Sequence, residues 1–200
     1  MENLAELEKF ARKNNIPVLL DDSAKFLADF VSKNKFKNIL EIGTAIGYSG
    51  SIILLSSEKA FLTTIEKNPD SYDRATNTFK EVNVADRVTQ ILGDGLEEIK
   101  KLEQQDKKYD LIFLDGPKGQ YLFYYPILLT MLTDGGCLLV DNVLFKGLVR
   151  SSEDVGHKKR AMITKLRKFL QEIESRDDLI TTIHEIGDGI AEIYLKKYRD

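Results

Sequence analysis

The stretch Asn38–Ser49, NILEIGTAIGYS, decides the fold of this 200-residue chain. It starts with a short apolar run, typical of a buried strand, and passes through a glycine-bearing turn into the start of a helix. Because Gly43 and Gly47 lack a Cβ atom, the backbone there can approach a ligand, and the helix start offers free N–H groups to it. The stretch therefore predicts a ligand-binding turn in an α/β fold.

The same alternation continues after this stretch. Short runs rich in Ile, Leu and Val alternate with longer amphipathic segments, as expected of strands buried on both faces and of the helices that cover them. Strands are predicted at Asn38–Ile42, Phe61–Glu66, Val88–Gly93, Tyr109–Asp115 and Gly136–Asn142. Helices are predicted between them at Ser49–Ser57, Pro69–Val82, Gly95–Gln105 and Tyr121–Leu132.

Two helix boundaries have clear local signals. Asn68-Pro69 reads as an N-cap followed by proline at the first helical position, and Asp134-Gly135-Gly136 reads as a helix stop with a turn. These signals predict a helix that begins at Pro69 and another that ends before Asp134.

The two ends of the chain do not follow the strand–helix alternation of the middle. Helices are predicted at Leu4–Lys13 and Ser23–Lys33 before the first strand, and at His157–Ser175 after an irregular stretch. Alternating runs at Leu179–Ile186 and Ile190–Lys197 flank Gly187-Asp188-Gly189 and predict an antiparallel hairpin. We expect a single domain, with residues 1–36 as a helical cap and residues 37–200 as the core.

Composition limits the alternatives. With 42% hydrophobic and 30% charged residues, a formal net charge of -3 and a pI near 5.6, the whole chain gives no global electrostatic argument for a nucleic acid or membrane partner. Cys137 is the one cysteine, so neither an internal disulfide nor a cysteine metal cluster is expected. The start has no signal-peptide pattern and no apolar run is long enough for a membrane span, so a cytoplasmic protein is expected.

Acidic residues at strand ends suggest what binds at the glycine turn. The spacing from Gly43 to Gly47 lacks the third glycine of the dinucleotide fingerprint, which makes a nicotinamide cofactor less favoured. Glu66 ends the second predicted strand, where a carboxylate can accept hydrogen bonds from ribose, and Asp94 follows the third, where it could bind an adenine amino group. Ribose and adenine without a phosphate cradle favour S-adenosylmethionine over NAD or ATP.

A second group of polar residues follows the next two strands. Asp115, Asp141 and Asn142 all present oxygen at the ends of adjacent strands, and oxygen ligands suit Mg²⁺, with Mn²⁺ or Ca²⁺ as possible substitutes. A hydroxyl bound to such a cation loses its proton more easily. Lys118, three residues after Asp115, is a candidate general base for that proton.

These residues resemble the metal-dependent O-methyltransferases of the catechol and caffeoyl-coenzyme A type. The resemblance covers nearly the whole chain, and its markers are Leu40–Ser49, Thr64–Glu66, Asp115–Tyr121, Asp141–Val143 and Gly187–Gly189. It implies a Rossmann-like fold with helices on both faces of a mostly parallel, seven-stranded sheet that ends in an antiparallel hairpin. It also implies a homodimer.

The resemblance also implies roles for single residues. Those that would border the methionine part of the donor are Glu41, Gly43, Tyr48 and Ser49, in the same turn as Gly47. Glu66 would bind ribose and Asp94 would lie near adenine. Asp115, Asp141 and Asn142 would hold the metal, Asp115 would also contact the donor, and Lys118 would be the catalytic base.

The acceptor is the open question. The chain has no tryptophan, whereas the catechol enzymes surround their substrate with this residue, and Lys118–Tyr121 and Asn15–Val18 are more similar to the bacterial enzymes that methylate 5-hydroxyuridine in the tRNA anticodon loop to 5-methoxyuridine. Basic residues in the 146–168 segment could grip phosphates: Lys146, Arg150, Lys158, Lys159, Arg160, Lys165, Arg167 and Lys168. A small catechol or caffeoyl-coenzyme A-like phenolic is the alternative acceptor, and a non-catalytic protein that binds S-adenosylmethionine is the second alternative.

Overall fold

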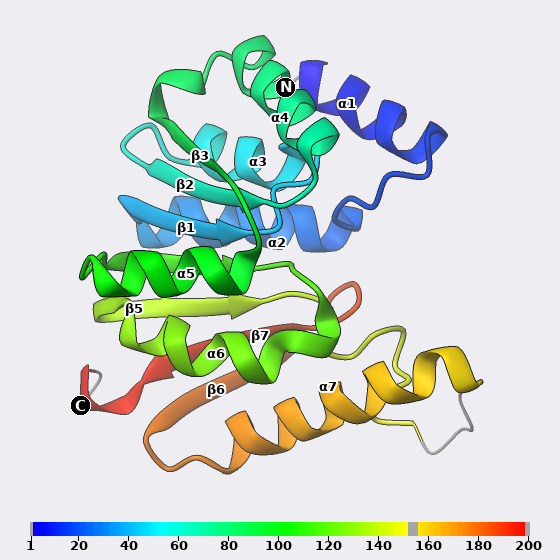
Figure 1. Ribbon diagram of the computed structural model, residues 1–200, viewed down its shortest axis with the longest axis vertical. Helices are drawn as coiled ribbons and strands as arrows, with labels where there is room; N and C mark the ends of the chain where they lie inside the picture. The colour runs from blue at the N-terminus through cyan, green and yellow to red at the C-terminus, as the bar shows by residue number, and fades with distance from the viewer. Residues whose placement is uncertain (1, 152–155, 199–200) are drawn as a thin grey trace. The chain divides into compact units, whose positions relative to one another are not determined.

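The computed structural model describes residues 2–151 and 156–198, and the chain divides into two compact units, residues 1–98 and 99–200. Its strands follow the order β3-β2-β1-β4-β5-β7-β6 of one seven-stranded sheet. This is the predicted fold class, with a mostly parallel sheet and a C-terminal antiparallel hairpin. The two units are described in turn (Figure 1).

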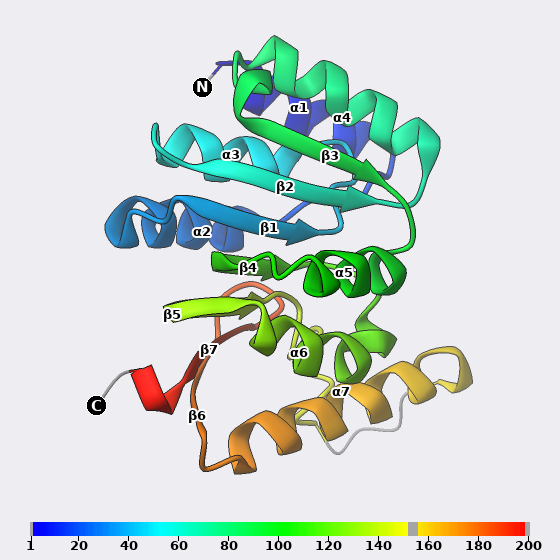
Figure 2. The same ribbon diagram turned by 60° about the vertical axis from the view of Figure 1, so that its left-hand side comes forward.

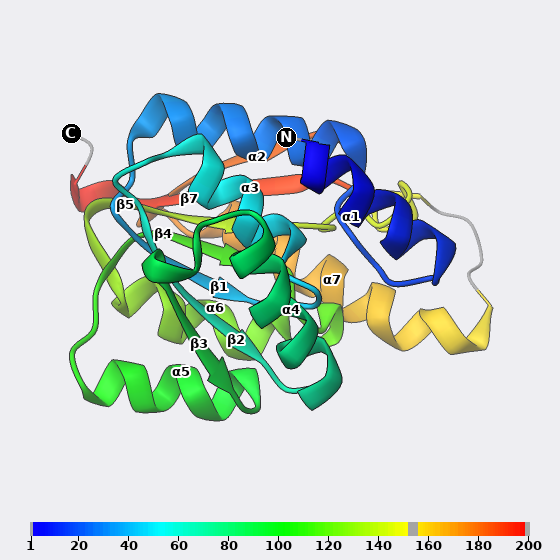
Figure 3. The same ribbon diagram turned by 90° about the horizontal axis from the view of Figure 1, so that it is seen from above.

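The first unit contains a parallel three-stranded segment. Its strands β1 (Asn38–Ile42), β2 (Phe61–Glu66) and β3 (Val88–Leu92) run side by side in the same direction (Figure 2). Its helices are α1 (Glu2–Lys13), α2 (Asp21–Asn34), α3 (Tyr48–Ser56), α4 (Pro69–Glu81) and the short η1 (Ala85–Arg87). Helix α3 lies beside α2 (Figure 3) and also contacts α1 and α4. Both predicted N-terminal helices are therefore confirmed.

Helix α4 begins where the sequence predicts. The side chain of Asn68 accepts a hydrogen bond from the Ser71 backbone N–H at 2.9 Å, and Pro69 is the first helical residue. This cap satisfies one of the backbone donors that a helix start leaves free.

The second unit contains the hairpin. Strands β4 (Tyr109–Leu114) and β5 (Leu132–Val140) are parallel, and β7 (Ile190–Leu195) is antiparallel to both β5 and β6 (Leu179–His184). Its helices are η2 (Lys118–Gln120), α6 (Tyr121–Thr130), α7 (His157–Ser175) and η3 (Lys196–Tyr198). Helix α5 (Gly95–Gln104) begins in the first unit and ends in the second.

The start of β5 differs from the prediction. Helix α6 ends at Thr130 and β5 begins at Leu132, so Asp134-Gly135-Gly136 lies inside the strand instead of forming a turn before it. The register between β4 and β5 shifts between Tyr109 and Leu111, and Gly135 has a φ of 76°. The glycine pair therefore produces an irregularity within the strand, which local sequence cannot distinguish from a loop.

Aromatic residues form much of the core of the second unit. The rings of Tyr121 and Tyr125 on α6 each meet the ring of Phe169 on α7 edge-on, at centroid distances of 5.6 Å. All three side chains are buried, and Tyr124 is buried with them. Edge-to-face aromatic contacts thus join α6, which follows the Lys118 segment, to α7.

Among the described residues, no helix combines the length and the apolar composition that a bilayer crossing requires.

Candidate active site

Glu41 is the buried centre of the predicted donor group in the first unit. Its side chain, on β1, has no exposed surface and accepts hydrogen bonds from the hydroxyls of Ser49 (2.5 Å) and Thr64 (2.6 Å). A buried carboxylate is costly unless it is hydrogen-bonded, and these two donors from α3 and β2 meet that cost. Glu41 and Ser49 are therefore in direct contact, and Glu41 fixes the first turn of α3 against β1 and β2.

The glycine turn before α3 is tightly wound. Gly43 and Gly47 have φ values of 102° and 83°, which favour glycine strongly, and Ala45 between them also has a positive φ of 45°. A Cβ atom at Gly47 would lie 3.2 Å from the Phe79 ring and 3.3 Å from the Ala75 backbone. Gly47 therefore also allows α3 and α4 to approach closely, a packing role that its spacing in the sequence does not reveal.

Nothing in the sequence indicated that Gly50 has a packing role. A Cβ atom there would lie 2.8 Å from the Leu62 side chain and 3.1 Å from a Glu41 carboxylate oxygen. The close approach of α3 to β1 and β2 thus depends on Gly50 as well. The contact crosses three elements, so no local motif could have signalled it.

Glu66 ties the glycine turn to the end of β2. Its Oε2 atom accepts a hydrogen bond from the Ala45 N–H at 2.8 Å, and its Oε1 atom accepts from the N–H groups of Lys67 (2.9 Å) and Asn68 (2.8 Å). A carboxylate offers about four acceptor positions. Three backbone donors therefore leave about one position for a ligand hydroxyl and hold the carboxylate still.

Asp94 and Tyr48 complete the predicted donor group. Asp94 accepts a hydrogen bond from the Leu96 N–H at 3.0 Å and so caps the start of α5. Tyr48 is buried, its hydroxyl lies 3.5 Å from Glu8 of α1, and burial, followed by the negative charge of Glu8, raises its pKa to about 12. The Tyr48 hydroxyl is therefore neutral at physiological pH and can donate a hydrogen bond. Helix α1 supplies an acidic neighbour that the sequence did not predict.

The second unit brings the predicted metal residues together. Asp115 follows β4 and Asp141 follows β5, and the Asp141 N–H donates to the Leu114 carbonyl at 3.0 Å. Asn142 donates from Nδ2 to the Asp141 carboxylate at 2.8 Å. Burial raises the pKa of Asp115, and the positive charge of Lys118 opposes that rise.

Asp141 has an oxygen that lacks a partner. The residue is 2% exposed, and its buried Oδ1 atom accepts no hydrogen bond from the part of the chain that the structure describes. Burial and then the charge of Asp115 raise its pKa to about 7. A buried, unpaired carboxylate oxygen beside a second carboxylate is a site that a cation would stabilise, so the residues fit a hard divalent metal with oxygen ligands.

The ligand set is small. Among residues 2–151 and 156–198, no three or more His, Cys, Asp or Glu side chains are grouped so that they could hold a metal ion. The predicted set has two carboxylates and one amide, which leaves room for water and for acceptor oxygens, as Mg²⁺ sites often do.

Tyr121 joins the two strand ends. Its buried hydroxyl donates to the Asp141 carbonyl at 3.0 Å and lies 3.4 Å from the Gly116 carbonyl. Its ring packs against Phe169 in the core, so the hydroxyl adds a polar contact to an apolar one. Tyr121 therefore holds the backbone at Gly116 and Asp141, next to the predicted metal residues, a role that only the fold reveals.

The basic residues of the 146–168 segment are in different situations. Arg167 donates to the carbonyls of Leu148, Val149 and Ser151, and Arg150 pairs with Glu174 and Glu185. Lys146, Lys159 and Arg160 are exposed, and Lys159 lies 5.8 Å from the centre of the Phe145 ring. The side chain of Lys158 lies outside the described residues. Arg150 and Arg167 thus serve the protein itself, which weakens their prediction as phosphate ligands.

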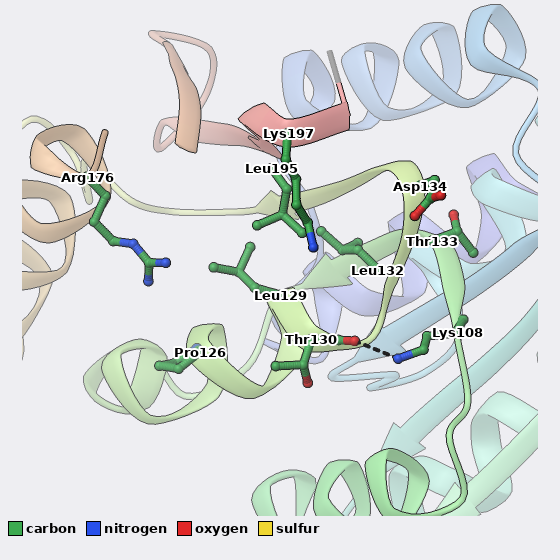
Figure 4. A pocket seen from close by; sticks show the side chains of 10 residues that line it. All are labelled: Lys108, Pro126, Leu129, Thr130, Leu132, Thr133, Asp134, Arg176, Leu195 and Lys197. Atoms are coloured by element: carbon green, nitrogen blue, oxygen red, sulfur yellow. Dashed lines mark hydrogen bonds between the residues drawn. The ribbon is translucent and has the colours of Figure 1, made fainter. Parts of the chain in front are cut away.

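A separate pocket lies at the other ends of β4 and β5. It has a volume of about 640 Å³ and contains no predicted site residue (Figure 4). Lys108 precedes β4 and donates to the Thr130 carbonyl at 2.9 Å, and Arg176, also in the wall, pairs with Asp178. Cations in the pocket wall are therefore engaged within the protein.

Comparisons with known proteins give the class of the molecule. The profile of the O-methyltransferase family matches residues 1–196. A caffeoyl-CoA O-methyltransferase of Populus kitakamiensis is 29% identical over 204 residues, which cover 95% of this chain and 85% of that protein. The chain therefore belongs to the O-methyltransferase family.

Solved structures agree with this assignment. The O-methyltransferase of Bacillus cereus in complex with SAH is 25% identical, with a TM-score of 0.84 and coverage of 98% of this chain and 91% of that one. The SAH-bound methyltransferase PaMTH1 of Podospora anserina is 25% identical, with a TM-score of 0.87 and coverage of 98% and 88%. The predicted enzyme class, an S-adenosylmethionine-dependent O-methyltransferase, is confirmed.

Proposed function

We propose that this enzyme transfers the methyl group of S-adenosylmethionine to a hydroxyl that is held, with a neighbouring oxygen, by a divalent metal at Asp115, Asp141 and Asn142. The observation that carries the proposal is the buried, unpartnered Oδ1 atom of Asp141 beside a second carboxylate. Such a cluster is costly without a cation. Mg²⁺ is the favoured ion because all three ligands offer oxygen.

The donor would be bound by the first unit. Glu66 has about one acceptor position left for a ribose hydroxyl, and Asp94 lies one strand further along the chain, at the start of α5. Glu41 would orient Ser49 at the start of α3, near the methionine part of the donor, with Tyr48 and the glycine turn around Gly43 and Gly47.

The residues of the second unit would act on the acceptor. A bound divalent metal would supply Lewis acidity, which lowers the pKa of a hydroxyl coordinated to it. Lys118, in its neutral form, would accept the hydroxyl proton at Nζ and become the ammonium ion, and in that charged form it acts on both Asp115 and Asp141. The acceptor oxygen would then form its bond to the methyl carbon as the bond to sulfur breaks, which releases S-adenosylhomocysteine. Positioning and electrostatics, without a covalent enzyme intermediate, would lower the barrier.

For the acceptor we propose 5-hydroxyuridine in the tRNA anticodon loop. Its hydroxyl and the neighbouring carbonyl can chelate a metal through two oxygens. Exposed Lys146 and Lys159 belong to the segments that follow Asn142 and could contact phosphates, and Phe145, whose ring lies near Lys159, is partly exposed. The protein would act as a homodimer, away from membranes.

A small phenolic acceptor is the second candidate, because relatives such as the Populus kitakamiensis protein carry the name caffeoyl-CoA O-methyltransferase. A catechol offers the same two adjacent oxygens to a metal, so the two candidates differ in what surrounds the reacting ring. A tRNA needs a cationic surface, whereas a free catechol does not.

Nucleoside analysis separates the two candidates. Mass spectrometry of tRNA from a strain that lacks the gene should show 5-hydroxyuridine in place of 5-methoxyuridine. The purified enzyme should restore the methyl group in vitro, and Lys118→Ala should not. Unchanged 5-methoxyuridine in that strain, together with rapid methylation of a catechol by the enzyme, would select the phenolic acceptor. No transfer to any hydroxylated acceptor would favour a protein that only binds the donor.

A further inference from the structure

The loop that starts at Asn142 has an unusual backbone. Asn142, Phe145 and Lys146 have positive φ values of 59°, 40° and 57°. Asparagine tolerates this region, but phenylalanine and lysine adopt it only at an energetic cost. Neighbouring contacts must therefore hold the loop in this conformation.

Those contacts come from the turn between β6 and β7. The N–H groups of Leu144 and Phe145 donate to the Asp188 carbonyl at 2.9 and 3.0 Å, and the Lys146 N–H donates to the Asp188 carboxylate at 3.1 Å. The Val143 N–H donates to the Gly189 carbonyl at 3.0 Å. Four consecutive backbone donors directly after Asn142 are thus bound by two residues of the hairpin.

Gly189 makes this close approach possible. It is buried, its φ is 86°, and a Cβ atom at this position would lie 2.4 Å from Cγ and 2.7 Å from Cβ of Leu144. Even alanine would therefore push the loop away from the hairpin. The need for glycine at position 189 therefore comes from the packing of Leu144 against it as well as from the positive φ of the turn.

We propose that Asp188 and Gly189 are positioning residues for the metal site, because they clamp the loop whose first residue is the metal ligand Asn142. The inference rests on the proposed function, in which Asn142 holds the metal beside Asp141. The hairpin thereby sets where the Asn142 amide points, although neither hairpin residue touches the substrate. Metal ligands depend on neighbours of this kind for their orientation.

Two matched pairs of variants test the proposal. Asp188→Ala removes the acceptor for the Lys146 N–H, whereas Asp188→Asn keeps an oxygen there. Gly189→Ala and Gly135→Ala both place alanine at a positive φ, 86° and 76°, but only the first meets the loop. At Gly135, no heavy atom of the described residues, apart from its chain neighbours, lies within 4 Å of the added Cβ. The two readouts are hydrogen exchange of the 143–146 amides and calorimetric titration with Mg²⁺, with S-adenosylmethionine affinity as the control.

Asp188→Ala and Gly189→Ala should speed exchange of these amides and weaken Mg²⁺ binding about tenfold or more, with donor affinity unchanged. Gly135→Ala should behave as the unaltered protein does in both readouts, and Asp188→Asn, which keeps the oxygen but removes a negative charge that acts on Asp141, should keep the slow exchange of these amides. Unchanged exchange or unchanged Mg²⁺ affinity in Gly189→Ala would overturn the proposal, as would an equal loss in Gly135→Ala. If the unaltered protein protects these amides but binds no divalent metal, the proposed function itself fails, and the hairpin holds a loop without a metal ligand.

Discussion

Replacement of Asp141 by asparagine should stabilise the metal-free protein above neutral pH. Burial, then the charge of Asp115, raises the pKa of Asp141 from 3.8 to about 7. Because the folded state holds this proton more tightly than the unfolded state, the free energy of unfolding falls as the pH rises from about 4 to about 7. A rise of about 3 pKa units, at about 1.4 kcal/mol each, corresponds to about 4 kcal/mol.

Urea unfolding in excess chelator would measure this effect. Between pH of about 5 and about 8.5, linkage predicts that the unaltered protein loses about 3 kcal/mol more stability than Asp141→Asn, which has no charge to bury. Added Mg²⁺ should stabilise the unaltered protein at the higher pH and leave the variant unchanged. Parallel pH profiles for the two proteins would refute the reasoning, because the buried charge of Asp141 would then carry no cost for a metal to relieve.

Three further substitutions test the support of the metal residues, the cap of α4 and the donor site. Tyr121→Phe removes the hydroxyl that donates to the Asp141 carbonyl, so it should cost about 1–2 kcal/mol of unfolding free energy and weaken Mg²⁺ binding in a calorimetric titration. Asn68→Ala removes the cap of α4 and should cost about 1 kcal/mol in urea unfolding with kcat unchanged, whereas a loss below about 0.3 kcal/mol would contradict the capping role. Glu66→Gln replaces one acceptor oxygen by a donor and should weaken S-adenosylmethionine binding about tenfold without changing Mg²⁺ affinity; equal donor affinity would exclude Glu66 from the donor site.

The sequence predicts the elements well because their signals are local. Apolar runs at β1, β2 and β4, the Asn68-Pro69 cap and the two alternating runs of the hairpin all carry the periodicity or the capping residue of the element they form. The start of β5 is the exception. Asp134-Gly135-Gly136 has the composition of a turn, and only pairing with β4 makes it an irregular part of a strand.

The sequence predicts the part of the site that lies directly at the ends of strands. Asp115 and Asp141 could be grouped in advance because parallel neighbouring strands bring their carboxyl ends to one edge. The hydrogen bond of Tyr121 to the Asp141 carbonyl could not be predicted, because it joins segments far apart in the chain. The same holds for the approach of Gly50 to Glu41 and for the hydrogen bond from Lys146 to Asp188. The contacts of Arg167 could not be predicted either: its guanidinium donates to the carbonyls of Val149 and Ser151, and phosphate binding at this residue stays a prediction.

The most direct test of the central claim measures transfer of a labelled methyl group from S-adenosylmethionine in the presence of excess chelator, followed by addition of Mg²⁺. The acceptors should be a catechol and tRNA that contains 5-hydroxyuridine, so that either substrate class can report. An enzyme that needs a metal at Asp141 should show no transfer in chelator, recovery of transfer on addition of Mg²⁺, and no recovery in Asp141→Asn. Full transfer in chelator, or recovery in Asp141→Asn equal to that of the unaltered protein, would contradict this need for a metal.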